Sequence, residues 1–257
     1  GKLEEAIDAY KKALTLKPDH QAARSQKLHQ QAQICDWASI KEDHNMICDL
    51  GTSQQNVSPF SLLSIEDAPQ RHRLRSESYA KSKYPQKPLT QPPRPLQKPE
   101  RLRIGYFSAD FHNHATMYLM AKVFEAHDKE DFEIFAYSFG PDQNDAMRSR
   151  LIKAVNVFDD VRDMGDQEIA LLAQQDKLDI AIDLKGYTKG SRSGIFAYGA
   201  APIQISYLGY PGTTGASFID YMIADKVVIP KQNEGFYSEA IILLPHSYQV
   251  NDNSRII

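Results

Sequence analysis

The sequence predicts an α/β protein in which a lobe built on a parallel β-sheet follows a short α-helical region. Apolar, β-favouring runs alternate with stretches of helical period after residue 100. A helical period also runs through the first 50 residues, and a proline-rich stretch separates the two regions. Strands that alternate with helices form βαβ units, and these units build a parallel sheet.

The amino-terminal region has an amphipathic helical pattern. Apolar side chains recur at three- and four-residue spacings from Leu3 to Leu14, and Pro18 closes the run. The pattern stays helical from residue 20 to about residue 50, where Trp37 is expected to anchor the core.

Part of this region resembles a known repeat. Gly1, Ala6, Tyr10, Ala13 and Pro18 have the relative spacings of the second half of a tetratricopeptide repeat, a helical hairpin of about 34 residues. Half a repeat cannot bury its own apolar face, and such arrays need about three repeats to be stable. We therefore expect more repeats before residue 1 in the natural protein. The alternative is a generic amphipathic helix.

A proline-rich stretch marks the expected domain boundary. Six prolines between Tyr84 and Glu100 forbid regular helix and sheet and favour an extended connection. The predicted organisation is the end of the repeats with linker helices in residues 1–50, a loop and Pro-rich connection in 51–100, and the sheet lobe in 101–257. The six prolines are Pro85, Pro88, Pro92, Pro93, Pro95 and Pro99.

The sheet lobe is expected to contain seven strands. Helical patterns lie between several of the apolar runs, at 117–127, 145–154 and 166–176. The expected strands are 102–107, 132–139, 155–161, 178–184, 203–208, 221–224 and 240–244.

Composition excludes several classes of protein. The 257 residues contain 30 Lys and Arg against 33 Asp and Glu, a net charge of -3, which argues against a nucleic-acid binder that works by overall charge. No apolar run approaches the roughly 18 to 20 residues of a membrane span, so we expect a cytoplasmic protein with no membrane partner. Cys35 and Cys48 are too few for a disulfide framework or a zinc site, and we expect buried or half-buried thiols.

The first expected strand ends in a polar cluster. Asp110, His112, His114 and Thr116 follow this strand and precede a helical pattern, at the sheet edge where α/β proteins bind ligands. Imidazole can accept a hydroxyl proton at neutral pH, and a nearby carboxylate can orient the ring and stabilise its charged form. The cluster therefore predicts a general base. The alternative is a helix N-cap and turn without a catalytic role.

Two glycine-containing loops follow later strands. Residues 185–192 combine two glycines and three cations, which suits a loop near an anionic ligand, although a solvated basic turn is the alternative. Glycines in 209–215 permit backbone N–H groups to face a ligand. The motifs G-x-S-x-G, G-x-x-x-x-G-K-[ST] and H-E-x-x-H do not occur, which excludes the enzyme classes that depend on them.

Four sequence blocks resemble, in order and spacing, the amino-terminal catalytic lobe of the O-linked N-acetylglucosamine transferase family. They are RLRIGYFSADFHNHAT (101–116), DLKGYTKGSRSGIFAY (183–198), APIQISYLGYPGTTGASFIDYMIAD (201–225) and ILLPHSY (242–248). The resemblance covers about residues 100–250. It implies a Rossmann-like lobe that forms one half of a GT-B glycosyltransferase, in an enzyme that carries tetratricopeptide repeats ahead of the lobe.

The resemblance also implies an activity. Members of the family are inverting, metal-independent enzymes that need no cofactor and transfer N-acetylglucosamine from the co-substrate UDP-N-acetylglucosamine to Ser or Thr of proteins. Protein acceptors would bind through the repeats, and a homodimer could form through the missing repeats. The lobe with the nucleotide contacts is expected beyond residue 257, so we expect the 257-residue chain to be inactive alone.

Particular residues match the family's motifs. His114 matches a proposed general base, and Asp110 matches another proposed proton acceptor, so the resemblance leaves two candidates for one role. The implied substrate-binding residues are Thr116, Lys189, Arg192, Leu208 and Gly209.

One departure from the family leaves other functions open. Gly199 and Ala200 stand where relatives usually have Arg-Pro, so a cation is absent from that turn. The alternatives are a GDP-fucose-dependent or N-linking glycosyltransferase of the same fold, or a non-catalytic repeat scaffold.

Overall fold

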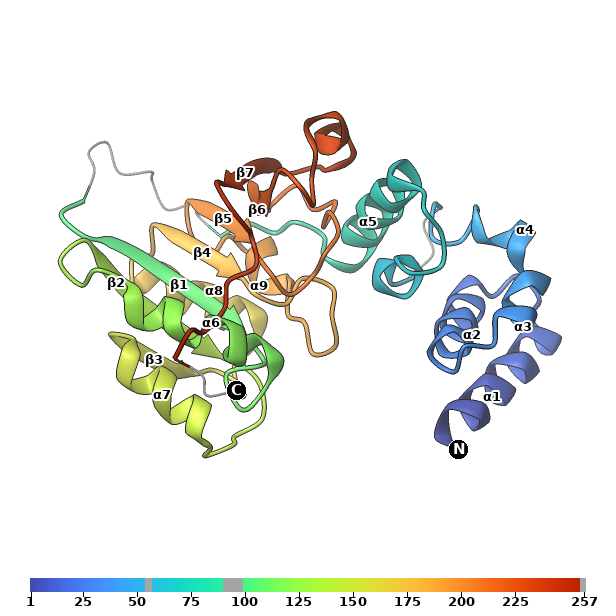
Figure 1. Cartoon of the computed structure of the whole chain (residues 1–257), viewed down its shortest axis with the longest axis horizontal. Helices are drawn as coiled ribbons and strands as arrows, with labels where there is room; N and C mark the ends of the chain where they lie inside the picture. Colours follow the sequence, from blue (N-terminus) through green and yellow to red (C-terminus); the bar gives the residue numbers. More distant parts are fainter. Residues whose placement is uncertain (54–56, 90–98, 255–257) are drawn as a thin grey trace. The chain divides into compact units, whose positions relative to one another are not determined.

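The computed structural model describes residues 1–53, 57–89 and 99–254. The chain divides into two compact units, each with its own packing. Figure 1 labels the helices and strands of both. The first unit consists of Gly1–Pro85, Gly212–Ala216 and Gly235–Ser238, and the second of Gln86–Pro211, Ser217–Glu234 and Glu239–Ile257. The predicted domain limits stay predictions.

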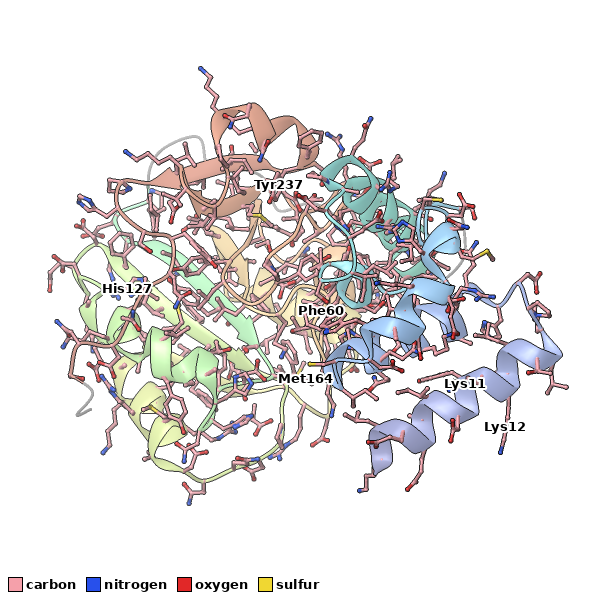
Figure 2. The ribbon with its side chains drawn as sticks, turned by 45° about the vertical axis from the view of Figure 1, so that its right-hand side comes forward. Lys11, Lys12, Phe60, His127, Met164 and Tyr237 are labelled. Carbon is pink, nitrogen blue, oxygen red and sulfur yellow. The ribbon has the colours of Figure 1, made fainter. Side chains whose placement is uncertain are left out.

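The first unit is helical. Helices α1 and α2 pack against each other as a hairpin, and α1 ends where the Lys17 N–H donates to the Ala13 carbonyl, just before Pro18. Lys11 and Lys12 lie on the exposed face of α1 (Figure 2). The elements are α1 (Lys2–Leu16), α2 (Gln21–Gln33), α3 (Trp37–Glu42), α4 (His44–Ile47), η1 (Pro59–Leu62) and α5 (Pro69–Lys83).

Two expectations for this unit are wrong. Trp37 is 54% exposed and is the first residue of α3, directly after the N-cap residue Asp36. Cys35 and Cys48 are both exposed free thiols, since each lies at a helix end. The core of the unit is formed instead by Leu28, Ile47, Leu50, Val57 and Leu62.

Helix α5 lies where the sequence predicts a loop and a Pro-rich connection. Its buried face is built around the fully buried Arg75, whose guanidinium donates to the carbonyls of Leu50 and Ile47 at 2.7 Å each and contacts Glu66. A helix that packs through an arginine has no apolar period, which is why the pattern does not reveal it. Pro92, Pro93 and Pro95 of the predicted connection lie outside the described residues.

The second unit is built on a seven-stranded sheet in the order β3-β2-β1-β4-β5-β6-β7, with all neighbours parallel. This is the strand order of a Rossmann fold with β7 added, so the predicted α/β class is confirmed. Each expected strand ends within two residues of the observed one. The strands are β1 (Leu102–Ser108), β2 (Phe132–Ser138), β3 (Val157–Asp160), β4 (Ile180–Asp183), β5 (Ile203–Ser206), β6 (Tyr221–Asp225) and β7 (Ala240–Leu244).

Both faces of the sheet are buried, as expected for parallel strands. Ile104 and Tyr106 of β1 face a core that includes Phe124. On the other face, Phe107 stacks on Tyr137 with ring centroids 4.4 Å apart. Helices α6 and α7 pack together, as do α8 and α9. The helical elements are α6 (Ala115–Ala126), α7 (Ala146–Ala154), α8 (Asp166–Gln175), α9 (Gly194–Ala197) and η2 (Lys231–Phe236). None of the helices in the described part of the chain has both the length and the apolar character that a membrane crossing requires.

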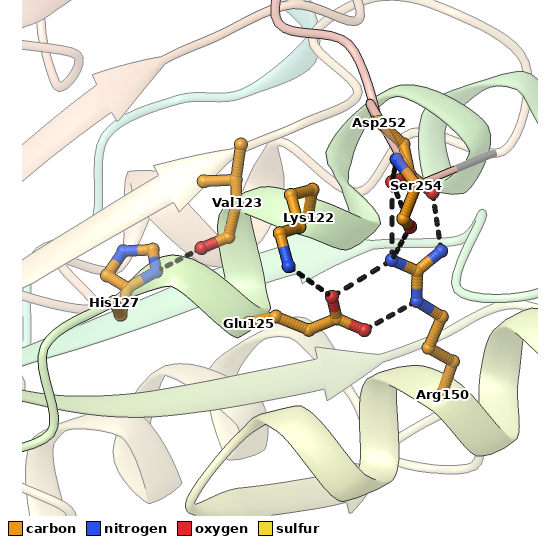
Figure 3. Close-up of polar contacts among 7 residues, drawn as sticks. All are labelled: Lys122, Val123, Glu125, His127, Arg150, Asp252 and Ser254. Carbon is orange, nitrogen blue, oxygen red and sulfur yellow. Dashed lines mark hydrogen bonds and ion pairs between the residues drawn. The ribbon is translucent and has the colours of Figure 1, made fainter.

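Arg150 of α7 links α6 to the chain that follows β7 through hydrogen bonds and ion pairs. Arg150 of α7 donates to both oxygens of Glu125 at 2.6 and 3.0 Å and to Asp252 at 2.5 and 3.3 Å (Figure 3). The same guanidinium also reaches Ser254 Oγ at 3.0 Å. Hydrogen bonds from Arg150 and Ser254 hold the pKa of the buried Asp252 carboxyl well below its usual range.

We expect Asp252→Asn to lower the free energy of unfolding by about 1 to 2 kcal/mol at pH 7. Because the pKa of Asp252 is lowered in the folded state, its ionised carboxylate contributes fully to the free energy of unfolding above about pH 4. This contribution is lost as the pH falls through the folded-state pKa. Urea unfolding of wild type and variant between pH 7 and pH 2 measures this. The two curves should converge at low pH, and a difference that persists undiminished at pH 2 would contradict the ion pair as its cause.

Candidate active site

The predicted cluster lies where the strand order reverses. Strands β1 and β4 are neighbours in the sheet, while the chain between them runs out through β2 and β3 and returns. In open α/β sheets such a switch point leaves a crevice beyond the carboxyl ends of the strands. The loops that follow β1 and β4 therefore meet at the position where a ligand is expected.

The β1–α6 loop is held in place by backbone contacts. The Asp110 N–H donates to the buried Ser108 Oγ at 2.9 Å, and the Asn113 N–H donates to Asp145 Oδ2 at 2.7 Å. Gly140 lies against the loop so closely that a Cβ there would be 1.8 Å from the Ala109 carbonyl oxygen. The loop therefore presents its polar side chains in a fixed arrangement.

His114 is the N-cap residue of α6, and Asp110 lies beside it. The His114 Nδ1 accepts from the Thr116 N–H at 3.2 Å and lies 3.6 Å from Asp110 Oδ2. Thr116 Oγ1 lies 3.2 Å from the same ring nitrogen and 3.5 Å from Asp110 Oδ2. His114 thus caps α6, as the alternative interpretation predicts, and it also lies beside Asp110 and Thr116, as the general-base interpretation requires. Because Nδ1 faces the helix and Asp110, Nε2 is the nitrogen left for a substrate, and the side chain is 42% exposed.

The β4 loop brings a residue that the motif analysis did not single out. Lys185 Nζ lies 2.6 Å from Asp110 Oδ2, although the two residues are far apart in the sequence. Asp183, at the end of β4, accepts the N–H groups of Lys185 and Gly186 at 2.8 and 3.0 Å. Burial raises the pKa of Asp183, and these two hydrogen bonds oppose the shift. The signal in the sequence was a lysine two residues after a strand-terminal aspartate.

Arg192, one of the two predicted substrate-binding cations, makes its contacts away from the Asp110–His114 cluster. Its guanidinium donates to Asp166 Oδ1 and to the Met164 carbonyl, each at 2.7 Å, so it is committed to the start of α8. Lys189 is exposed on the same loop. The structure therefore does not bring Arg192 to the Asp110–His114 cluster, and the substrate-binding roles of both cations stay predictions.

The β5 loop makes a strained turn next to Lys185. Leu208 has a φ of +66°, and the Gly209 N–H donates to the Tyr207 carbonyl at 2.8 Å, which forms a γ-turn. A branched residue in this region of φ is a true outlier, and such strain gathers at functional sites. A Cβ on Gly209 would lie 2.0 Å from the Leu184 carbonyl oxygen. Leu208 and Gly209 thus lie against the loop that carries Lys185, and their substrate-binding roles stay predictions.

The glycines further along this loop have a different role. Gly215 has a φ of +62°, and a Cβ there would lie 2.2 Å from the Glu77 backbone nitrogen of α5. Thr213 Oγ1 accepts from the Ser238 N–H at 3.1 Å within the same unit. The expectation that glycines in 209–215 turn their N–H groups to a ligand is therefore wrong for Gly215, because its N–H donates to Thr213 Oγ1 at 3.2 Å.

Comparisons with known proteins identify the chain's relatives. A family model described as glycosyl transferase family 41 matches residues 79–257. The chain belongs to this family. The family-41 match confirms the resemblance found in the sequence. Among residues 1–53, 57–89 and 99–254, no group of three or more His, Cys, Asp or Glu side chains is placed to hold a metal ion.

Family-41 relatives include plant and animal enzymes. The chain is 48% identical over 153 residues to the probable UDP-N-acetylglucosamine–peptide N-acetylglucosaminyltransferase SEC of Arabidopsis thaliana, covering 60% of this chain and 16% of that protein. It is 37% identical over 163 residues to the UDP-N-acetylglucosamine–peptide N-acetylglucosaminyltransferase of Caenorhabditis elegans, covering 63% of this chain and 14% of that protein.

A solved structure supports the same fold. A mutant of the Thermobaculum terrenum O-GlcNAc transferase matches with a TM-score of 0.71 and 27% identity, over 97% of this chain and 42% of that chain. The Rossmann-like lobe predicted from the resemblance is therefore confirmed. The chain spans less than half of that structure and about a sixth of the plant and animal relatives.

Proposed function

We propose that this protein is an inverting O-glycosyltransferase that transfers N-acetylglucosamine from UDP-N-acetylglucosamine to Ser or Thr of proteins. The observation that carries the proposal is the Asp110–His114 cluster at the β1/β4 switch point of a family-41 lobe, completed by Lys185. The names of the Arabidopsis and Caenorhabditis relatives support the choice of donor.

The reaction needs one proton acceptor from this lobe. The acceptor hydroxyl oxygen forms a bond to the anomeric carbon on the side opposite UDP, and the bond from that carbon to the phosphate oxygen breaks. UDP leaves with the electron pair, and the hydroxyl proton passes to His114 or Asp110. Accepting this proton in the transition state contributes about 10²- to 10⁴-fold to the rate.

The remaining parts of the proposal concern the whole protein. The lobe would act as one half of a GT-B enzyme, with the diphosphate bound by a second lobe. The α1–α2 hairpin supports a repeat region that binds protein acceptors. A homodimer formed through such repeats belongs to the same proposal. A cytoplasmic location and catalysis with no cofactor or metal belong to the same proposal.

Incubation of the full-length protein with labelled UDP-N-acetylglucosamine and a peptide library tests the function. We expect label on Ser or Thr, with an anomeric configuration opposite to that of the donor. A parallel reaction with GDP-fucose tests the competing donor. Transfer from GDP-fucose alone would overturn the choice of donor, label on Asn would overturn the linkage, and saturable binding of neither nucleotide sugar would indicate the scaffold.

A further inference from the structure

A buried ion pair connects the two loops of the switch point. Lys185 and Asp110 are 5% and 8% exposed, and Lys185 Nζ lies 2.6 Å from Asp110 Oδ2. Lysine and aspartate are almost never this buried unless they are paired. Removal of one partner would leave the other charge desolvated and uncompensated. The ammonium and the carboxylate therefore compensate each other's charge in this buried position.

The backbone around Lys185 fixes the direction of its side chain. Its N–H donates to Asp183 Oδ1 at 2.8 Å, and its carbonyl accepts from Thr188 Oγ1 at 2.9 Å. Gly209 packs against it so closely that a Cβ there would be 3.1 Å from the Lys185 Cα. Contacts within the β4 loop and with the β5 loop thus fix the backbone of Lys185, from which the ammonium reaches Asp110.

Resting on the function proposed above, we propose that Lys185 is a positioning residue that reserves the role of base for His114. Asp110 Oδ2 is 2.6 Å from the ammonium but 3.6 Å from His114 Nδ1, so Lys185 is the nearer partner of the carboxylate. Protonation of Asp110 would leave the buried ammonium unpaired, which disfavours Asp110 as the acceptor of the substrate's proton. The His114 side chain is 42% exposed, and its ion pair with a carboxylate in the described part of the chain is made through Nδ1.

The pair also limits how strongly Asp110 acts on His114. A free carboxylate stabilises a neighbouring imidazolium, whereas a carboxylate paired with an ammonium has little net charge to offer. The groups that face His114 are Asp110 and Thr116, with the His112 ring centroid 5.6 Å away and Lys185 reaching it through Asp110. Loss of the ammonium should therefore make His114 easier to protonate.

Titration of His114 by NMR in the full-length protein, without substrate, tests the inference. In Lys185→Met we expect the midpoint of the His114 titration to rise above that of the wild type. The acid limb of kcat/KM should move up with it. Lys185→Arg keeps the positive charge, so the midpoint of its His114 titration should rise less than that of Lys185→Met. Lys153→Met, a change of an exposed lysine on α7, should alter neither quantity.

A second pair of variants covers the case in which Lys185→Met does not fold. Asp110→Asn leaves the ammonium near His114 and should lower its titration midpoint, and Asp110→Asn with Lys185→Met should return it toward wild type. An unchanged midpoint in all of these variants overturns the inference. Absence of transfer by the wild type counts only against the proposed function, because the titration needs no substrate.

Discussion

The His114→Ala variant is expected to lose about 10²- to 10⁴-fold in kcat for glycosyl transfer, with little change in donor affinity. Nδ1 lies near Thr116 Oγ1 and Asp110, so Nε2 accepts the hydroxyl proton in the ring tautomer whose Nδ1–H points to these oxygens. Single-turnover transfer with a saturating donor measures the effect. Donor binding, measured separately by calorimetry, should stay within about threefold of wild type.

His114→Asn is the matched control, because His114 also caps α6 through the Thr116 N–H. Loss of a cap costs about 1 kcal/mol in stability, and asparagine is a good N-cap residue that cannot accept the proton. We expect His114→Asn to restore the melting temperature that His114→Ala loses, while transfer stays slow. Recovery of the rate together with stability would show that His114 acts only as a cap.

Sequence patterns predict the sheet well because their information is local. Each strand is a short apolar run with a helix or loop after it, and the burial of both faces makes these runs continuous. The Asp110–His114 cluster is predictable for the same reason. Both residues lie in one short loop between β1 and α6, so their proximity does not depend on the rest of the fold.

Contacts between distant segments are what the sequence patterns do not show. The Lys185–Asp110 ion pair exists because β4 lies next to β1, and that neighbourhood depends on the order of the strands. For Arg192, closeness in the sequence does not lead to closeness in space. It lies in the same basic loop as Lys185, yet its guanidinium turns to Asp166 at the start of α8. A cluster of cations in the sequence thus divides between two partners in space.

Helix α5 was missed for a physical reason that applies more widely. Apolar periodicity detects helices that bury hydrocarbon. Helix α5 instead buries Arg75, whose guanidinium donates to the carbonyls of Ile47 at the end of α4 and of Leu50 just after it. Its remaining side chains are mostly polar. The predicted loop and Pro-rich connection in 51–100 was based on the six prolines between Tyr84 and Glu100, which follow α5.

Gly209→Ala is expected to lower the free energy of unfolding by about 2 to 3 kcal/mol and transfer by about 10²-fold. The added Cβ would lie 2.0 Å from the Leu184 oxygen and 2.7 Å from the Leu184 carbonyl carbon. Both are backbone atoms, so no side chain can rotate away, and the β5 loop must move by about 1 Å to regain ordinary contact distances. Denaturant unfolding and single-turnover transfer measure the two effects.

The reason for the large effect on transfer is that Gly209 is the point where two loops of the candidate site touch. Any shift of this residue moves Leu208 on one side and Lys185 on the other, and Lys185 carries the shift to Asp110. Gly235→Ala is the matched control, since a Cβ there meets no atom within 4 Å, and its stability should stay within about 0.5 kcal/mol of wild type. If Gly209→Ala were as stable and as active as Gly235→Ala, the contact between the β4 and β5 loops would not be what holds the site together.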